Sequence, residues 1–399
     1  MTHKVKTLKE AVAPVTFLNC IFCMGIFEIP ANRPRFLLSA VYVVSMLTGY
    51  FFVLYQGIVI FKRKFGYTYV LFYFVLTINV MVAILAIILF WRKSENVHNL
   101  IKRCSMADVT IEALGIKREY QKIFRQNIYL IIFWIAGMIL LIFMYSIWMY
   151  RDIEIIQACY VNMCFCIPIM INSIVDTTFI TFLKCIQRKF RNINILLNNI
   201  VQCANKSNVF KIPAEQDKTC IATIRAQYKN QKDKILHLIQ TLRHLHLEST
   251  KIARQINKTY CMQLLLELAV HFAIVTATCY SLYISLSGLN HNFTVTNDKI
   301  IAMFVWGCIY SSKIIIVNDI CTRVSEEAYK TGEIVQSFEG SGLDNDMREE
   351  IHQFTQQIVL QSLNFTAAGF FTINNSFTGK FFATVTTYVV ILIQMDTPT

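Results

Sequence analysis

Seven apolar stretches, each long enough to cross a bilayer as a helix, limit most strongly how this chain of 399 residues can fold. A helix needs about 20 apolar residues to cross the hydrocarbon core. The stretches are Phe36–Phe61, Tyr69–Trp91, Ile128–Tyr150, Ile155–Leu183, Tyr260–Leu289, Ile300–Val317 and Phe377–Met395. Because 55% of the residues are hydrophobic and only 16% are charged, the sequence predicts an all-α membrane protein with seven transmembrane helices.

The positive charges lie in particular loops, which suits membrane orientation better than nucleic-acid binding despite the net charge of +13. We therefore expect no nucleic-acid partner. The chain lacks His-Glu-x-x-His, Gly-x-Ser-x-Gly and a phosphate loop, so we expect no enzyme, no catalytic residues and no cofactor. Cys20-x-x-Cys23 has no second pair at zinc spacing, so no metal site is expected.

The distribution of Lys and Arg predicts which way the chain crosses the membrane. The segments before the first stretch and after the second, fourth and sixth carry 5, 8, 15 and 3 basic residues, whereas the segments after the first, third and fifth carry 3, 1 and 1. The positive-inside rule therefore places the N-terminus in the cytoplasm and the C-terminus outside. Lys62, Arg63 and Lys64 fall on the predicted outer side and argue against this orientation.

This topology divides the chain into seven segments. They are a cytoplasmic N-terminal segment at 1–35, transmembrane helices one to four at 36–183, cytoplasmic helical extensions forming an anchor at 184–259, helices five and six at 260–317, a second anchor segment at 318–376, the last helix at 377–395 and an extracellular tail at 396–399. Asn292 begins an Asn-Phe-Thr sequon in a predicted outer loop.

The predicted anchor has helical periodicity on both sides of a turn at Asn205–Lys218. Apolar residues continue the fourth helix, and a heptad seam about three repeats long precedes the fifth. The seam packs either within the chain or against a neighbouring subunit. His237, His244 and His246 on this segment are expected to be solvated. The seam consists of Ile235, Leu238, Leu242, Leu245, Ser249, Ile252 and Ile256. A further helix is predicted at Glu349–Ile373, with a break at Gly369 and Asn374-Asn375.

The last apolar stretch has one polar face. Residues at steps of three and four share a face of a helix, and the polar stripe defined in this way is Lys380, Thr384, Thr387, Ile391 and Gln394. The neighbouring stripe of Phe381, Val385, Tyr388, Leu392 and Met395 is bulky and mostly apolar. Polar side chains in a membrane usually face protein or water. The polar stripe therefore lines a watery path, or its hydroxyls bond back to their own helix.

Ionisable side chains also lie inside the predicted spans. Glu267 and His271 are one turn apart in the fifth span, and Lys313 lies at a similar depth in the sixth. Because an unpaired charge there costs about 2.5–3.5 kcal/mol, we hypothesise an ion pair between Glu267 and Lys313. A neutral Glu267 bonded to water is the alternative.

The C-terminal residues resemble the signature of insect gustatory receptors. Thr387-Tyr388 is followed by five apolar residues and Gln394, and Met395 stands where the family carries Phe. Ala367 to Asn374 and the region from Ile256 to Leu265 are also similar to family segments.

This resemblance implies a ligand-gated, nonselective cation channel in the plasma membrane of sensory neurons. Four copies would surround a central pore lined by the last helix and pass Na⁺, K⁺ and Ca²⁺, alone or with co-receptor subunits, in contact with membrane lipid. Carried onto this chain, the constriction comprises Gln394, Met395 and Ile391, with Thr387 and Thr384 further along the pore. Lys380 either snorkels to lipid headgroups or lies in a wide wet vestibule.

The resemblance also implies a pocket for a small-molecule tastant within each subunit, open to the outside. Aromatic and polar residues in the outer halves of the helices are the candidates: Tyr73, Tyr145, Trp148, Tyr160, Asn162, Tyr280, Ser281 and Trp306. This set suits an aromatic, bitter or plant-derived ligand better than a sugar. A sugar-gated receptor and a seven-helix receptor without a pore are the alternatives.

Overall fold

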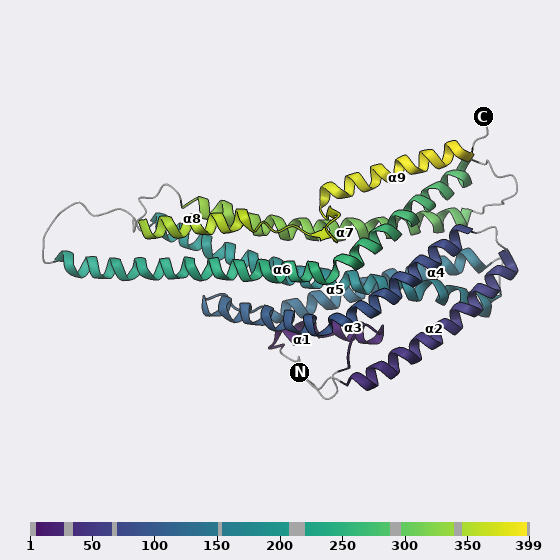
Figure 1. The fold of residues 1–399 in the computed structure, drawn as a ribbon, viewed down its shortest axis with the longest axis horizontal. Coiled ribbons are helices and arrows are strands. Elements are labelled where there is room, and N and C mark those ends of the chain that lie inside the picture. The colour runs from purple at the N-terminus through teal and green to yellow at the C-terminus, as the bar shows by residue number, and fades with distance from the viewer. Residues whose placement is uncertain are drawn as a thin grey trace.

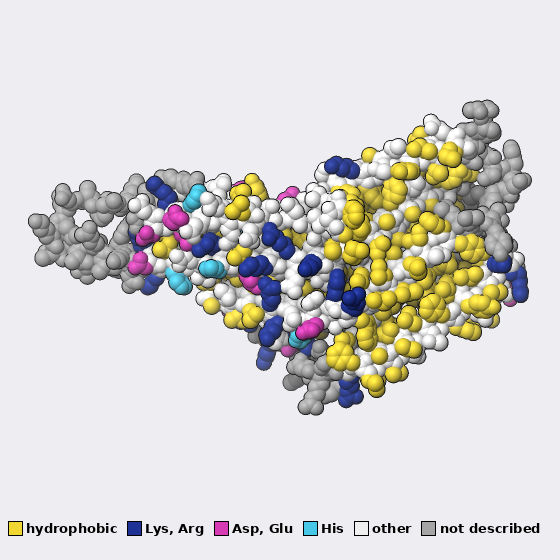
Figure 2. Space-filling view, in the orientation of Figure 1, with side chains coloured by type: hydrophobic (Ala, Val, Ile, Leu, Met, Phe, Trp, Pro, Cys, Tyr) yellow, Lys and Arg dark blue, Asp and Glu magenta, His cyan; other side chains and the backbone are white. Residues whose placement is uncertain are grey.

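The computed structural model is an elongated bundle of helices with one apolar half and one charged half (Figures 1 and 2). It describes residues 5–27, 35–65, 70–150, 154–206, 220–287, 297–338 and 345–396. Asn292 and most of the predicted turn at Asn205–Lys218 lie outside these residues. In Figure 2, hydrophobic side chains cover the right half of the visible face, and the charged side chains gather on the left.

Among the described residues, seven helices are long and apolar enough to cross a membrane. These helices are α2 (Phe36–Phe65), α3 (Val70–Ala113), α4 (Tyr120–Tyr150), α5 (Ile155–Lys206), α6 (Cys220–Ser287), α7 (Asn297–Gln336) and α9 (Asn375–Asp396). Each contains one predicted span, except that residues 69, 288 and 289 lie outside the described residues. The prediction of seven membrane-competent helices is therefore confirmed.

Several of these helices run far beyond the apolar half. α6 has 68 residues, which corresponds to about 100 Å at the rise of an α-helix, more than twice the thickness of a bilayer. α5 continues past Leu183, as its periodicity predicts. α3 also continues to Ala113, although only its apolar part, up to Trp91, was predicted to be helical.

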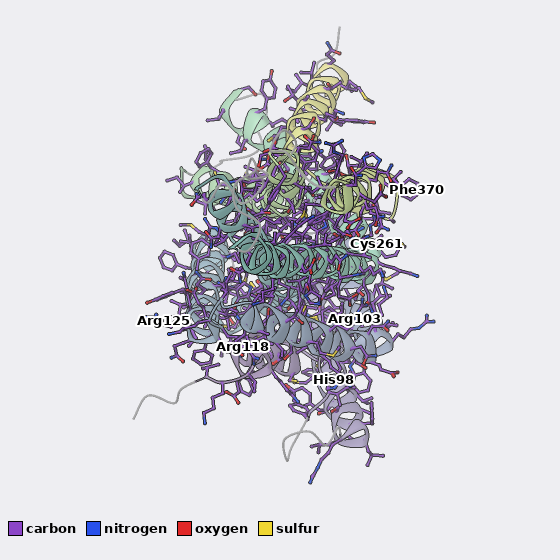
Figure 3. All side chains as sticks on the ribbon, turned by 90° about the vertical axis from the view of Figure 1, so that its left-hand side faces the viewer. His98, Arg103, Arg118, Arg125, Cys261 and Phe370 are labelled. Carbon is purple, nitrogen blue, oxygen red and sulfur yellow. The ribbon has the colours of Figure 1, made fainter. Side chains whose placement is uncertain are left out.

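The heptad seam of α6 packs inside the single chain. Leu242, Ser249, Ile252 and Ile256 are fully buried, and α6 contacts α3, α5, α7 and α8. Of the two arrangements left open by the sequence, the structure shows packing within the chain. Arg103 of α3 forms an ion pair with Glu248 of α6, with Nη2 and Oε1 2.6 Å apart. In Figure 3, Arg103 lies on the opposite side of the bundle from Arg125 of α4.

His246 departs from the prediction of solvated histidines. Its ring is buried between Phe190 of α5 and Phe354 of α8. Its Nε2 lies 3.3 Å from the carbonyl oxygen of Ala328. His246 lies outside the predicted membrane-spanning segments, and burial lowers its pKa from 6.5 to about 4.

The segment before α9 differs from the predicted helix at Glu349–Ile373. α8 (Asn345–Leu360) ends earlier, and β1 (Thr366–Ala367) pairs with β2 (Phe371–Thr372) in a small antiparallel hairpin. Gly369 has a φ of +82° in the turn, a conformation that glycine adopts without strain. The amide of Phe377 donates to Asn374 Oδ1 at 2.9 Å, so Asn374 caps α9. The chain breaks at both predicted positions.

The N-terminal helix α1 (Leu8–Ile21) lies against α4, α3 and α5. Thr7 caps it by accepting from the amide of Glu10. Asn127 of α4 donates to the carbonyl of Ala11 at 2.9 Å, and Thr178 of α5 donates to Asn19 Oδ1 at 3.1 Å. α1 is therefore an integral part of the bundle.

Candidate functional site

The polar stripe of α9 is exposed along the whole helix. Lys380, Thr384, Thr387, Ile391 and Gln394 are all exposed in the single chain. α9 is set apart on one side of the bundle, where it contacts α6 and α7 (Figure 1). This polar face is accessible on the surface of one chain.

The threonines of this face use their hydroxyls locally. Thr384 donates to the carbonyl of Lys380 at 2.8 Å, and Thr387 donates to that of Ala383 at 3.1 Å. The alternative in which hydroxyls bond back to their own helix is thus observed in the single chain. Each hydroxyl oxygen can still accept a hydrogen bond. The threonine hydroxyls therefore make this face polar while their protons are already engaged.

Aromatic contacts fix the other side of α9. The ring of Phe272 on α6 packs edge-on against Phe381 at 5.7 Å and Tyr388 at 5.5 Å. Phe381 and Val385 are buried, whereas Tyr388 and Met395 are exposed. The apolar stripe therefore anchors the first half of α9, and the second half projects further from the chain.

Three predicted pocket residues meet between α4, α5 and α7. Tyr145 and Trp306 pack edge-to-face with ring centroids 4.3 Å apart. Phe165 stacks on Tyr145 with ring centroids 5.7 Å apart, and Tyr310 lies edge-on to Trp306 at 6.1 Å. Asn162 donates to Ser146 at 2.8 Å in the same region. We call Tyr145, Asn162, Phe165, Trp306 and Tyr310 the aromatic cluster.

The aromatic cluster holds buried polar atoms without partners in the described part of the chain. These atoms are the hydroxyls of Tyr145 and Tyr310 and the side-chain oxygen of Asn162. A buried polar group without a hydrogen bond costs about 1–3 kcal/mol. A ligand that reaches these groups would recover that cost.

The remaining predicted pocket residues belong to α3, α4, α5 and α6. Tyr73 packs edge-on against Phe61 of α2 at 5.5 Å. The backbone of Tyr160 lies close to Gly57 of α2. Tyr280 and Ser281 are partly exposed near the end of α6. The side chain of Trp148 lies outside the described residues. Tyr73 and Tyr160 thus lie against α2, whereas Tyr145 and Trp306 meet each other.

The buried ion pair differs from the hypothesis. Lys313 Nζ of α7 lies 3.0 Å from Asp176 Oδ2 of α5. Glu267 of α6 lies beside Asp176, but the ion-pair partner of Lys313 is Asp176. Glu267 Oε1 accepts from Gln263 at 2.8 Å. The pair therefore joins α5 to α7, and Glu267 is a neighbour from α6.

Sequence reasoning missed Asp176, Tyr310 and Phe165. A signal for Asp176 was present, because an acidic residue inside an apolar span is a candidate functional residue by its position alone. Tyr310 follows Trp306 by four residues and so shares its helix face. Phe165 gives no signal, because phenylalanine is common in such spans.

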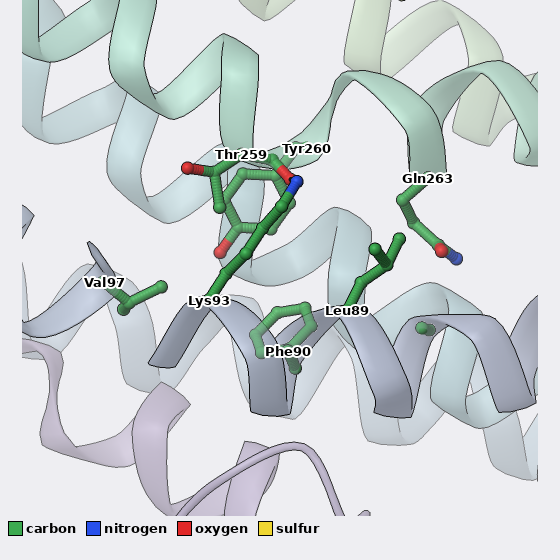
Figure 4. Close-up of a pocket in the computed structure, with 8 residues that line it drawn as sticks. Leu89, Phe90, Lys93, Val97, Thr259, Tyr260 and Gln263 are labelled. Atoms are coloured by element: carbon green, nitrogen blue, oxygen red, sulfur yellow. The ribbon is translucent and has the colours of Figure 1, made fainter. Parts of the chain in front are cut away.

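A small cavity lies between α3 and α6 where these helices leave the apolar half (Figure 4). Lys93 spans it and donates to the carbonyl of Thr259 at 2.7 Å. Its volume of about 10 Å³ is at most enough for one water molecule. A tastant cannot fit there. The hydrogen bond of Lys93 instead joins α3 to the backbone of α6. Among the described residues, no group of His, Cys, Asp or Glu side chains is arranged to hold a metal ion.

The sequence matches a known family over most of its length. The sequence model described as "7tm Chemosensory receptor" matches residues 18–397. Gustatory and pheromone receptor 32a of Drosophila melanogaster is 31% identical over 150 residues, which cover 38% of this chain and 32% of that receptor. Putative gustatory receptor 28b of the same organism is 22% identical over 305 residues, which cover 75% of this chain and 64% of that receptor.

A third relative, gustatory receptor for sugar taste 43a of Drosophila melanogaster, is 24% identical over 159 residues, covering 40% of this chain and 36% of that receptor. The fold is similar to that of the solved olfactory receptor OR5 from Machilis hrabei. The TM-score is 0.69 at 13% identity, covering 98% of this chain and 99% of OR5. OR5 has also been solved in complex with eugenol, with a TM-score of 0.59 at 13% identity and the same shares covered.

Proposed function

This chain belongs to the seven-transmembrane chemosensory receptor family, and we propose that it is a gustatory receptor that acts as a tastant-gated, nonselective cation channel. The observation that carries the proposal is the exposed polar face of α9. A helix crossing a membrane with Lys380, Thr384, Thr387 and Gln394 on one side needs protein or water against that side. Four copies arranged around an axis would supply both.

In the assembled channel, the polar stripes would surround a path for Na⁺, K⁺ and Ca²⁺. Ile391, Gln394 and Met395 would form the outer constriction, and the threonine hydroxyls would line the path below it with oxygen atoms. Lys380, at the inner end, would lie in the vestibule or reach the headgroups. The proposed location is the plasma membrane of sensory neurons, with the subunits assembled as a homotetramer or with co-receptor subunits.

The proposed tastant site is the aromatic cluster. Its rings would stack on a flat ligand, and its unpartnered hydroxyls would bond a ligand acceptor or donor. The eugenol complex of OR5 supports a small aromatic ligand, so a bitter or plant-derived compound is the first candidate. The match to a receptor named for sugar taste supports a sugar as the second. Ligand binding opens the pore only if the open state binds the ligand more tightly.

Cation flux into liposomes containing the purified protein tests this proposal. We expect an aromatic plant compound to evoke flux, and Trp306→Ala to raise the half-maximal concentration at least tenfold. Tyr73→Phe is the matched control, because Tyr73 lies away from the cluster and should leave that concentration unchanged. Protein that binds such a compound without any flux would favour the receptor without a pore, and equal effects of both substitutions would reject the cluster as the site.

A further inference from the structure

A groove of about 590 Å³ lies between α4, α5 and α7 and gathers positive charge. Lys184, Arg188 and Arg191 of α5 and Arg323 of α7 line it, and Glu327 is the acidic residue among its lining residues. Glu327 Oε1 accepts from Asn194 at 2.9 Å, so this carboxylate is already engaged. With Asp319, which pairs with Arg323, two carboxylates lie near four cationic side chains, and the excess of positive charge suits the groove to an anion.

The groove lies at the predicted inner boundary of the membrane. Lys184 directly follows the fourth span, Arg188 lies five residues beyond it, and Arg323 lies six residues beyond the sixth. At 1.5 Å per residue, the two arginines are about 8–9 Å past the hydrocarbon edge, where the headgroup layer of the inner leaflet meets the cytoplasm. Arg191 lies about 12 Å past that edge. The basic side chains therefore extend from the level of a phosphodiester to a level beyond it.

The other side of the groove is apolar. Tyr129 and Phe133 of α4 line it and are 67% and 71% exposed. They belong to the first two turns of the third predicted span, so they lie at the depth of acyl chains. The groove is therefore apolar toward the membrane and basic toward the cytoplasm, which matches the two parts of an acidic phospholipid.

The contacts within the chain use only some of the donors of these two arginines. Arg188 donates through Nη2 to Gln126, while its buried Nη1 has no hydrogen-bond partner among the described residues. Arg323 Nε lies 2.9 Å from Asp319 Oδ2, which holds that guanidinium in place. A guanidinium carries five donors and binds phosphate oxygens in pairs. Both guanidiniums therefore keep donors beyond those engaged in these contacts.

We propose that this groove binds a phosphoinositide of the inner leaflet. Its acyl chains lie along Tyr129 and Phe133, its phosphodiester contacts Lys184 and Arg188, and the phosphates on its inositol ring reach Arg191 and Arg323. Basic pockets between membrane helices on the cytoplasmic side bind headgroups of this class. A lipid with a single phosphate would leave Arg191, the furthest of the four from the hydrocarbon edge, without a ligand.

The groove is connected to the start of α9. Thr322, next to Arg323, accepts from the amide of Asn375 at 2.9 Å, and Asn318 donates to Thr378 at 2.7 Å. A lipid bound to Arg323 would thus hold the part of α7 that supports the first turn of α9. If α9 lines the pore, as proposed above, the lipid would also alter gating.

Binding of lipid to the purified full-length protein tests the proposal without any need for channel activity. The probes are a phosphatidylinositol bisphosphate and phosphatidylserine in nanodiscs, together with the soluble inositol phosphate headgroup. Arg191→Gln changes an exposed residue, so the fold should persist. Arg92→Gln is the matched control, because Arg92 is exposed on α3 at the same boundary and lies outside the groove.

We expect the bisphosphate lipid to bind at least tenfold more tightly than phosphatidylserine. Arg191→Gln should weaken its binding about fivefold, and Arg188→Gln combined with Arg191→Gln about 20-fold or more. Arg92→Gln should change it less than twofold. Three results would overturn the proposal: unchanged binding in the groove variants, an equal loss in Arg92→Gln, or equally tight binding of phosphatidylserine or the soluble headgroup.

Discussion

The ion pair between Asp176 and Lys313 allows a quantitative prediction about how the membrane helices hold together. Its atoms are 3.0 Å apart, and the two side chains are only 8% and 16% exposed. At an effective dielectric constant of about 20, unit charges at this distance attract by about 5–6 kcal/mol. Removing one partner leaves a buried charge alone, which costs about 3–5 kcal/mol.

We therefore expect Asp176→Asn and Lys313→Met each to lower the free energy of unfolding by about 3 kcal/mol or more. The double variant should lose clearly less than the sum, because neither charge is then left unpaired. The assay is thermal unfolding of the purified protein in detergent, with all variants in the same buffer.

Glu267→Gln is the matched control for this cycle. Its Oε2 is buried without a hydrogen-bond partner in the described part of the chain, and its carboxylate lies beside that of Asp176. Replacing this carboxyl group by a carboxamide should change stability by less than about 1 kcal/mol or increase it. Additive effects of the Asp176 and Lys313 substitutions, or coupling of Lys313 to Glu267 in place of Asp176, would refute the reasoning.

Two further predictions concern the predicted anchor and the start of α9. In the unfolded state, His246 becomes protonated below its ordinary pKa of 6.5, whereas in the folded state it becomes protonated only near pH 4. Stability should therefore fall by up to about 3 kcal/mol as pH drops from 6.5 to 4, and His246→Phe should remove this share of the pH dependence in unfolding scans. Asn374→Ala should lower the thermal midpoint by removing a helix cap of about 1 kcal/mol, whereas Asn374→Asp should keep it. An unchanged pH profile in His246→Phe, or equal losses in both Asn374 variants, would contradict these assignments.

The apolar stretches predicted the membrane helices well because length and hydropathy alone determine whether a helix can cross a bilayer. The continuation of α5 was also predictable, since Ile186, Phe190 and Ile193 keep helical spacing. The extension of α3 was predictable on the same ground and was missed, since Leu100, Cys104, Ala107 and Ile111 follow steps of three and four and are buried. The hairpin before α9 is two residues per strand, too short to give a periodicity.

The site was predictable only in part. The polar stripe follows from helical geometry, because α9 is straight and its residues need no partner to be assigned to a face. The aromatic cluster depends on which faces of α4, α5 and α7 meet, and the sequence does not show this. The predicted pocket residues therefore included Tyr145 and Trp306 together with residues outside the cluster. The partner of Lys313 depends on the rotation of α5 relative to α6, which places Asp176 closer than Glu267.

The central claim is that the polar face of α9 lines the path of the ions. Cysteine substitution at Thr387, on that face, and at Val385, on the buried face, tests it when a charged thiol reagent is added during ligand-evoked current. The account predicts that the reagent blocks current through Thr387→Cys and leaves Val385→Cys like the unsubstituted protein. Block at Val385→Cys with none at Thr387→Cys would contradict it.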